Sequence, residues 1–466
     1  MIVMQTTNSE KLKNQLQDLD ITVLIDRGTV SFLQLRIVLI CFGIMAVDGF
    51  DTFIISYIAS ALTDEWGIES ASLAPLLSAG LLGLMVGAFI FGPLADRFGR
   101  KKILVLSMVF FGVTTIFSAL SHNLAELTVL RFLTGLGLGG AMPAALTLTS
   151  EYCPNRRRSF MVMLMFCGFT LGSSLGGLAS AYLIDMFDWR AVLWLGGGLP
   201  LVLLPFSLFM LPESVRYLVL KRQKPGQVKK IMDQIAPGLD FSNVRFSIPE
   251  NAKGVPAAAL FRPGLLKGTL LLWAGFFMSL LAMFLLANWL PTLLKMMGLT
   301  QKTASLVSMM FTAGGTCGAI VLGLLMDKIS QSRVLTVSFT CAGLFIAMLG
   351  NLPAVPWLLA LIVFFSGICL SGSQVGINAL AASYYPTDCR ATGVSWANSV
   401  GRLGSVIGSM AGGVMMAMQF SNPTVFLLTG IPATLTGVAM LLFSILHHRN
   451  ARKEAAERAS AKCFSS

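Results

Sequence analysis

Two aspartates, Asp48 and Asp51, lie inside a long apolar run, in the stretch GIMAVDGFDTFIIS at 43–56. They are three residues apart, so in a helix their side chains share one face. An ionised group near the centre of a membrane costs about 2.5–3.5 kcal/mol even on the lenient insertion scale. Burial and a like charge both disfavour an ionised carboxylate, so we expect at least one of the pair to bind and release a proton near the working pH. The alternative is that both acids only cap or hydrogen-bond helices.

Two arginines, Arg131 and Arg402, fall within other apolar runs. A buried guanidinium without a partner is as unfavourable as a buried carboxylate, so each should face a cavity or an acid. We expect Arg131 to pair with Asp51, and protonation of Asp51 to release it. Arg402 is the candidate for binding an anionic carboxylate, because a guanidinium can donate two parallel hydrogen bonds to that group. Two alternatives stay open. Arg131 could donate hydrogen bonds to backbone carbonyls only, and Arg402 could form a purely structural ion pair.

Uncharged polar residues within the apolar runs give weaker indications. We expect a set of amides and one tryptophan to line a substrate cavity: Asn288, Trp289, Gln374 and Asn378. An amide in a membrane helix can instead bond a neighbouring helix, and a tryptophan often anchors a helix at the membrane surface. Both alternatives stay open for these residues.

The elements that must hold these residues are membrane helices. The chain is 55% hydrophobic and 12% charged, with a mean hydropathy of +0.76, whereas soluble domains carry about 25% charged residues. A helix needs about 20 apolar residues to cross a bilayer, and runs of this length predict twelve such helices in an all-α integral membrane protein. The expected organisation is an N-terminal segment at 1–36, a six-helix bundle at 37–211, a linker at 212–264, a second six-helix bundle at 265–447 and a tail at 448–466.

Basic residues mark one side of the membrane. Lys and Arg gather in every second connection, for example at 97–102 and 156–158. Basic loops favour the cytoplasm, so both termini and the linker are expected there, with the chain in the inner membrane of a bacterium. Topology then explains the net charge of +12 better than nucleic-acid binding does. The eight cysteines include no CxxC pair and no cluster with histidine, so no metal site is expected.

The two halves of the chain share a pattern. GPLADR begins at Gly92 and GLLMDK at Gly323, 231 residues later, while GSSLGG begins at Gly172 and GSVIGSMAGG at Gly404, 232 residues later. A constant offset near half the chain length indicates two related bundles. Membrane carriers built in this way bind substrate near the midplane, between the halves. Asp48 lies about 16 Å along its helix, near the middle of a core about 30 Å thick.

Three loops and helix ends resemble signature sequences of the major facilitator superfamily. They are GPLADRFGRKK at 92–102, RFLTGLGLGG at 131–140 and LPESVRYL at 211–218. The resemblance implies gating roles for residues of the first loop and for two residues at cytoplasmic helix ends: Gly92, Asp96, Arg97, Gly99, Arg100, Asp327 and Arg390. We expect the basic residues of the loop to pair with acids across the boundary between the halves. A loop that only orients the protein in the membrane is the alternative.

A closer resemblance is to the aromatic acid:proton symporters of that superfamily. It rests on DGFDT at 48–52 and on YYPTDCRATGVSW at 384–396. It implies proton-coupled uptake of 4-hydroxybenzoate, protocatechuate or a related benzoate. GFDT also resembles the first helix of proton-coupled sugar carriers, whose aspartate is the proton site, and this favours Asp51 over Asp48. The sequence differs from the family at Ser60, where the family often has a proline. This difference is expected to alter a helix kink or the extracellular gate.

Other functions stay open as alternatives. The string GSSLGG at 172–177 lacks the proline of the G-P-x-x-G-G pattern in drug antiporters, which favours uptake by symport. The alternatives are a carrier of the same superfamily for another small organic acid, a sugar or a drug, and a transporter-like membrane sensor. The sequence contains no nucleophile–base set and no GxxxxGK[ST] string, so neither an enzyme nor a nucleotide-driven pump is expected. The expected partners are a small aromatic carboxylate, protons and the lipid bilayer, with no cofactor and a monomeric chain.

Overall fold

Long helices make up most of the described chain. The computed structural model describes residues 17–21, 25–26, 30–221, 225–235, 244–247, 260–262, 264–386 and 389–464. In this part of the chain twelve helices are long and apolar enough to cross a membrane, as predicted. Because the bilayer core holds no water, a spanning segment must satisfy its backbone hydrogen bonds internally, and a helix does so. The predicted all-α membrane fold is confirmed.

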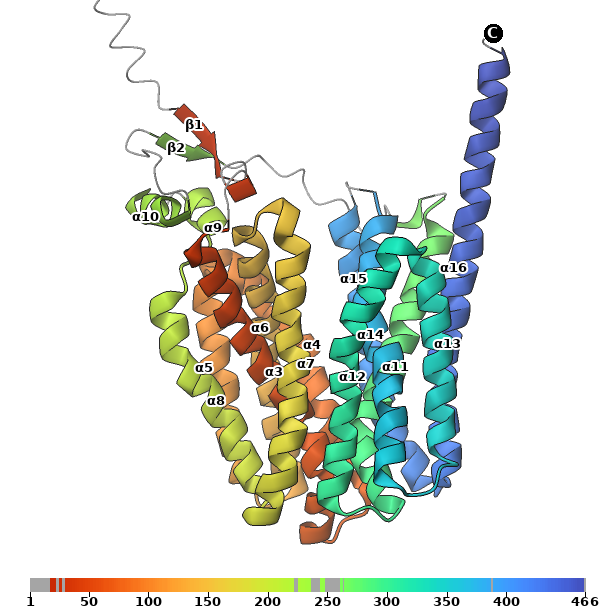
Figure 1. Cartoon of the computed structure of the whole chain (residues 1–466). Helices are drawn as coiled ribbons and strands as arrows, with labels where there is room; N and C mark the ends of the chain where they lie inside the picture. The colour runs from red at the N-terminus through yellow and green to blue at the C-terminus, as the bar shows by residue number, and fades with distance from the viewer. Residues whose placement is uncertain are drawn as a thin grey trace, which may run out of the picture.

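The helices form two bundles that lie side by side (Figure 1). The N-terminal bundle consists of α3 (Phe32–Trp66), α4 (Ala74–Phe98), α5 (Arg100–Ala119), α6 (Leu124–Tyr152), α7 (Asn155–Met186) and α8 (Trp189–Met210). The C-terminal bundle consists of α11 (Leu266–Met296), α12 (Gln301–Lys328), α13 (Gln331–Leu349), α14 (Pro356–Tyr384), α15 (Arg390–Ala417) and α16 (Asn422–Phe464). The bundles meet where α7 contacts α12, where α3 contacts α11 and where α4 contacts α15.

Short elements cover one end of the N-terminal bundle, where the chain passes from one bundle to the other (Figure 1). We call this the linker end. The elements are α9 (Val215–Leu220), α10 (Pro225–Ile235) and two strands, β1 (Gln17–Asp20) and β2 (Val244–Ser247). The strands pair in parallel, with Gln17 opposite Val244. The strand pair was not predicted, because QDLD and VRFS are too short and too polar to stand out as strands in the sequence.

Side-chain caps define where helices begin and end. The backbone N–H of Ser31 donates to Gln34 Oε1 (2.7 Å), and the backbone N–H of Gln34 donates to Ser31 Oγ (3.4 Å). This capping box starts α3 at Phe32, five residues before the bundle start that the sequence indicated. The helix ends at Trp66, and the next residue, Gly67, has a left-handed φ of 61° that suits glycine. At the other end of the chain, α16 continues to Phe464, through most of the predicted tail.

Equivalent glycines hold equivalent helices together in the two bundles. Gly172 of α7 packs on α3 so closely that a Cβ there would overlap the carbonyl oxygen of Ala46. Gly404 of α15 packs on α11 in the same way, at the carbonyl of Phe277. The two glycines are 232 residues apart and their contacts 231. Small residues let membrane helices approach closely, so the repeat in the sequence corresponds to the same helix contact made twice.

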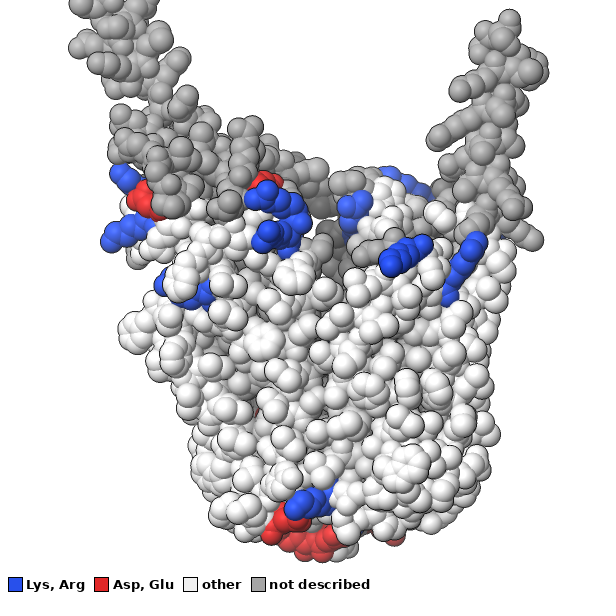
Figure 2. Space-filling view, viewed as in Figure 1, with Lys and Arg blue, Asp and Glu red and all other residues white. Residues whose placement is uncertain are grey.

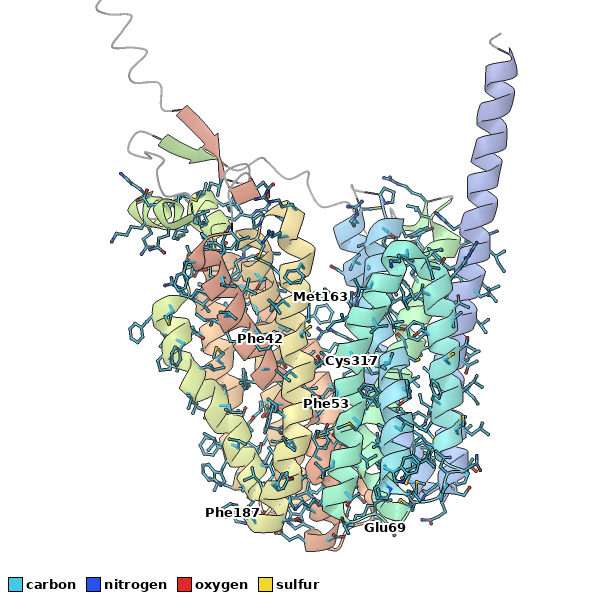
Figure 3. The ribbon with its side chains drawn as sticks, in the orientation of Figure 1. Phe42, Phe53, Glu69, Met163, Phe187 and Cys317 are labelled. Carbon is cyan, nitrogen blue, oxygen red and sulfur yellow. The ribbon has the colours of Figure 1, made fainter. Side chains whose placement is uncertain are left out.

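Charged side chains avoid the middle of the molecule on the face that Figure 2 shows. Lys and Arg are concentrated at the linker end. The opposite end, which we call the loop end, carries a smaller group of acidic and basic residues, and Glu69 and Phe187 mark it in Figure 3. An uncharged band between two charged ends is what a bilayer core requires. The protein is therefore a multi-pass membrane protein.

Candidate functional site

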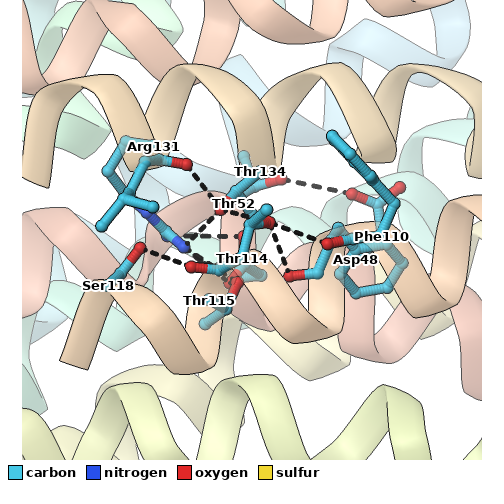
Figure 4. A network of polar contacts seen from close by, with 11 residues as sticks. Asp48, Thr52, Phe110, Thr114, Thr115, Ser118, Arg131 and Thr134 are labelled. Carbon is cyan, nitrogen blue, oxygen red and sulfur yellow. Dashed lines mark hydrogen bonds and ion pairs between the residues drawn. The ribbon is translucent and has the colours of Figure 1, made fainter. Parts of the chain in front are cut away.

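Asp51 and Arg131 form a buried ion pair inside the N-terminal bundle, and Figure 4 shows Arg131 with the threonines that surround it. Arg131 Nη2 of α6 lies 3.4 Å from Asp51 Oδ1 on α3, and the two side chains are 4% and 2% exposed. Thr115 of α5 donates to Asp51 Oδ1 (2.8 Å) and accepts from Arg131 Nη2 (2.9 Å). Arg131 Nη2 also donates to Thr134 (3.1 Å). The two residues thus lie together as expected from the sequence, and each compensates a charge that would be unfavourable alone.

A small cavity borders this ion pair. Its volume is about 30 Å³, and it lies between α3, α4 and α6. The polar part of its lining comes from Asp51, Thr52, Arg131 and Thr134, and the rest is mostly leucine. A cavity of this size can hold a water molecule when polar groups line it. Asp51 therefore borders a space of about the size of one water molecule.

Asp48 lies one turn before Asp51 on α3 and has fewer partners. Its Oδ1 atom accepts a hydrogen bond from Thr52 (3.3 Å), and its Oδ2 atom is buried without a hydrogen-bond partner among the described residues. The residue is only 1% exposed. A carboxylate can accept about four hydrogen bonds, so Asp48 is poorly satisfied. The two aspartates therefore differ: Asp51 is held in an ion pair, and Asp48 keeps an unused oxygen.

Arg402 of α15 reaches across the boundary between the bundles. Its Nη2 atom donates to the sulfur of Met142 on α6 (3.6 Å), and its Nη1 atom is buried with no hydrogen-bond partner in the part of the chain described. A thioether is a weak acceptor. Arg402 therefore presents unused donors between the bundles, an arrangement that fits an anion.

Asn288 and Trp289 are engaged in bonds between two helices of the C-terminal bundle. Asn288 Nδ2 donates to Ser409 Oγ (2.6 Å), and Trp289 Nε1 donates to the Ser409 carbonyl (2.8 Å). Both residues are buried, and Trp289 is too deeply buried to anchor the helix at a membrane surface. Their polar groups fasten α11 to α15, which weighs against contact with a substrate. The cavity-lining role of both residues stays a prediction.

Gln374 and Asn378 of α14 also bond neighbouring helices. Gln374 Oε1 accepts from Ser279 Oγ of α11 (3.0 Å), and Asn378 Oδ1 accepts from Asn398 Nδ2 of α15 (2.9 Å). Both side chains are half-buried, so part of each amide remains accessible. A role in lining the cavity is compatible with these bonds and stays a prediction.

The signature loop between α4 and α5 contacts acids of its own half. Arg100 Nη2 lies 2.8 Å from Asp96 Oδ1 and 3.7 Å from Glu151 Oε1. Gly99 has a φ of 110°, and the carboxylate of Glu213 occupies the place that a Cβ there would need. We expected partners across the boundary between the halves. In the described residues these contacts lie instead within the N-terminal half and the start of the linker, because the bundles stand apart at the linker end (Figure 1).

The other predicted gating residues occupy separate places. Gly92 lies inside α4 with open space beside it, and the guanidinium of Arg97 lies over the ring of Phe98. Arg390 Nε donates to the carbonyl of Tyr385 at the start of α15 (3.3 Å). The side chain of Asp327, near the end of α12, lies outside the described residues. The gating roles stay predictions.

The two bundles are joined across the loop end. Gln301 of α12 accepts a hydrogen bond from Ser60 on α3 and donates one to the Tyr57 carbonyl (2.8 Å). Lys295 of α11 forms an ion pair with Asp64 of α3. The ribbons agree, since the bundles converge at this end (Figure 1). Ser60, at the position where the resembled family often has proline, thus contributes a side chain to the closure.

Sequence reasoning did not find Thr115 and Thr134, which hold Asp51 and Arg131 in place. Hydroxyls are common in the apolar runs, and many of them bond a carbonyl one turn earlier in their own helix. Thr128, for example, donates to the carbonyl of Leu124 (2.7 Å). Thr134 makes such a bond as well, to the carbonyl of Leu130 (2.9 Å), so no pattern in the sequence marks it as a partner of Arg131.

Fold and site together define a class of protein. Two related six-helix bundles with buried charges at their centre form the architecture of membrane carriers that alternate between two arrangements. Among the described residues, no group of three or more His, Cys, Asp or Glu side chains is placed to hold a metal ion. The chain belongs to the Major Facilitator Superfamily, whose family model matches residues 41–350 and 272–465. The resemblance seen in its loops is thereby confirmed.

The chain is similar over nearly its full length to known transporters. It is 42% identical to a 4-hydroxybenzoate transporter of Pseudomonas aeruginosa, over 93% of this chain and 97% of that protein. It is 40% identical to a 4-hydroxybenzoate transporter of Acinetobacter baylyi (95% and 98%) and 41% identical to a gallate transporter of Pseudomonas putida (91% and 94%). A solved structure of a D-xylose–proton symporter matches with a TM-score of 0.68 at 18% identity, over 88% of this chain and 97% of that one. That last likeness concerns the fold alone.

Proposed function

We propose that this protein takes up an aromatic carboxylate, such as 4-hydroxybenzoate, protocatechuate or a related benzoate, together with protons. The substrates named for its relatives support an aromatic acid. The observation that carries the proposal is the half-buried Arg402, whose buried Nη1 atom has no hydrogen-bond partner among the described residues. A carboxylate can accept two parallel hydrogen bonds, one from each terminal nitrogen of the guanidinium. Surroundings of low polarity strengthen these hydrogen bonds.

Proton coupling is proposed to act through Asp51. In the arrangement described, Arg131 and Thr115 hold its carboxylate while the bundles are joined at the loop end. A proton on Asp51 would remove the negative charge and release Arg131, which then needs other partners. That change favours a different arrangement of the bundles. The arrangement described then corresponds to the carrier after it has delivered its proton, and Asp48 tunes the response to substrate.

We further propose that the linker end faces the cytoplasm of a bacterium, with the chain in the inner membrane and both termini inside. The basic residues at the linker end support this orientation (Figure 2). The protein would act as a monomeric transporter and not as an enzyme. The proton gradient would supply the energy, with no cofactor.

Uptake by proteoliposomes tests the proposal. Purified protein is offered labelled 4-hydroxybenzoate, protocatechuate, benzoate and gallate, with and without an imposed inward proton gradient. We expect at least one of these acids to accumulate, and only with the gradient. Flux of a sugar, a drug or an aliphatic acid but of no aromatic acid would support the alternative carriers. Saturable binding without flux would support a sensor.

A further inference from the structure

Three phenylalanines from both bundles meet where α3 and α7 face α11. Phe53 of α3 stacks on Phe284 of α11, with ring centroids 5.8 Å apart and planes inclined by 14°. Phe169 of α7 meets the Phe53 ring edge-on, at 6.1 Å. Figure 3 shows Phe53 at the boundary between the bundles. The stacked pair is therefore a contact between side chains of the two halves that must move relative to each other during transport.

The stacked pair lies on the face of α3 that is turned towards the other bundle, slightly nearer the loop end than Asp51, whose side chain leaves α3 on nearly the opposite face. Phe53 follows Asp51 by two residues on α3, which runs from the linker end to the loop end. In the other bundle, Gly404 is two residues from Arg402 and packs on α11 about two turns before Phe284. Phe53 and Phe284 are 3% and 9% exposed. The pair is therefore a largely buried aromatic contact, and it lies between the level of the Arg402 guanidinium and the closed loop end.

We propose that Phe53 and Phe284 form the subsite that receives the aromatic ring of the substrate and that selects aromatic over saturated acids. The inference rests on the proposed function, in which Arg402 binds the carboxylate. The ring of such an acid prefers an apolar surface to the polar linker end. Aromatic rings also attract one another in offset or edge-on geometries beyond the effect of burial. A saturated ring of similar size gains the burial without that attraction.

The position of the pair links ring binding to the transport cycle. One phenylalanine belongs to each half, so a ring that contacts both is held best in one relative position of the halves. A ligand shifts a conformational equilibrium only by its differential affinity for the two arrangements. The aromatic ring would therefore contribute to that difference.

Competition measurements test the subsite. Proteoliposomes take up labelled 4-hydroxybenzoate while unlabelled benzoate or cyclohexanecarboxylate competes, because these two acids differ in the ring alone. Phe284→Leu and Phe53→Leu remove a ring and keep apolar bulk. Each should lower the preference for benzoate over cyclohexanecarboxylate about two- to tenfold. Phe284→Tyr keeps a ring and should retain the preference.

A matched control comes from a second ring pair in the C-terminal bundle. Phe345 of α13 and Phe365 of α14 have centroids 5.9 Å apart, and Phe365 is 41% exposed. Phe345→Leu should leave the preference unchanged.

The inference is overturned if both leucine variants at Phe53 and Phe284 keep the wild-type preference. Should a leucine variant fail to reach the membrane, the methionine variant at that position is measured instead. Absence of uptake of every aromatic acid by the unaltered protein would contradict the proposed function itself, and this inference with it.

Discussion

Arg402 and Met142 meet across the boundary between the two bundles, with 3.6 Å between the guanidinium Nη2 and the thioether sulfur. The contact joins α15 to α6 and gives the cation only a weak acceptor. A charge buried in a membrane with so little compensation marks a functional site. We attribute the position of Arg402 to the binding of a substrate carboxylate.

Arg402→Lys should weaken the binding of benzoate-like anions about tenfold or more. Lysine keeps the positive charge but cannot donate two parallel hydrogen bonds to a carboxylate. A hydrogen bond to a charged group contributes about 1.5–3 kcal/mol. Calorimetric titration of the purified protein with 4-hydroxybenzoate measures the change. Met142→Leu removes the sulfur at nearly constant volume and should leave the affinity nearly unchanged. Unaltered affinity in Arg402→Lys would reject the carboxylate contact.

Asp51→Asn should abolish proton-driven accumulation and spare substrate exchange. The amide has nearly the same size but cannot bind or release a proton, and it no longer balances the charge of Arg131. Accumulation under a pH gradient is compared with counterflow, in which labelled substrate outside exchanges with unlabelled substrate inside.

Asp48→Asn is the companion variant in that comparison. Because Asp48 has an unused oxygen and no ion-pair partner in the described chain, its change should alter substrate affinity and leave accumulation in place. If Asp51→Asn kept full pH-driven uptake while Asp48→Asn lost it, the two assignments would be reversed.

Lys295→Met should loosen the closure at the loop end. The ion pair with Asp64 is partly exposed, and such pairs contribute about 0.2–1 kcal/mol, so the population open at this end should rise about 1.5- to fivefold. Spin labels at Glu69 and Met296, read by double electron–electron resonance, report the distance between the halves. The charge-reversed pair of Lys295→Asp with Asp64→Lys should restore the wild-type distribution.

The control for this change is another ion pair at the same end. Arg190 lies 3.0 Å from Glu65, and both residues belong to the N-terminal bundle. Arg190→Met should leave the distance distribution unaltered. The gating role of Lys295 is rejected if the two variants shift the distribution equally, or if Lys295→Met shifts it not at all.

Asn288→Ala should lower stability and leave substrate affinity unchanged. The variant leaves Ser409 without the amide that now bonds it, and a lost buried hydrogen bond of this kind costs about 1–3 kcal/mol. Thermal unfolding of the solubilised protein and titration with 4-hydroxybenzoate measure the two effects separately. A fall in affinity at unchanged stability would support the predicted role of Asn288 in lining the substrate cavity.

The features that were predictable from the sequence follow from the properties of the bilayer. Apolar runs of sufficient length must be helices, because lipid offers no partner for backbone groups. The proximity of Asp51 and Arg131 was predictable for a related reason, since opposite charges buried in apolar runs are stabilised by meeting. The two-bundle fold was predictable from glycines such as Gly172 and Gly404, which recur at a constant offset.

The direction in which a side chain points was not predictable. The helix α11 is apolar on nearly all sides, so it lacks the periodicity that marks the inner face of a helix in a soluble protein. The sequence therefore did not indicate that the polar groups of Asn288 and Trp289 bond α15, and their predicted role in lining a cavity stays untested. Phe53 and Phe284 were overlooked because phenylalanine suits lipid, core and cavity equally well. The partners of Arg100 depend on which end of the molecule is closed, and no sequence pattern states that.

The central claim is that a proton gradient drives an aromatic carboxylate through this protein. Its most direct test is the accumulation of labelled 4-hydroxybenzoate in proteoliposomes that are made acidic outside, before and after addition of a protonophore. One proton per monoanion makes transport electroneutral, so a membrane potential alone should drive little uptake at that ratio. The account predicts accumulation above the external concentration, which collapses with the protonophore and is absent in Asp51→Asn. Accumulation that persists after the gradient has been abolished would contradict it.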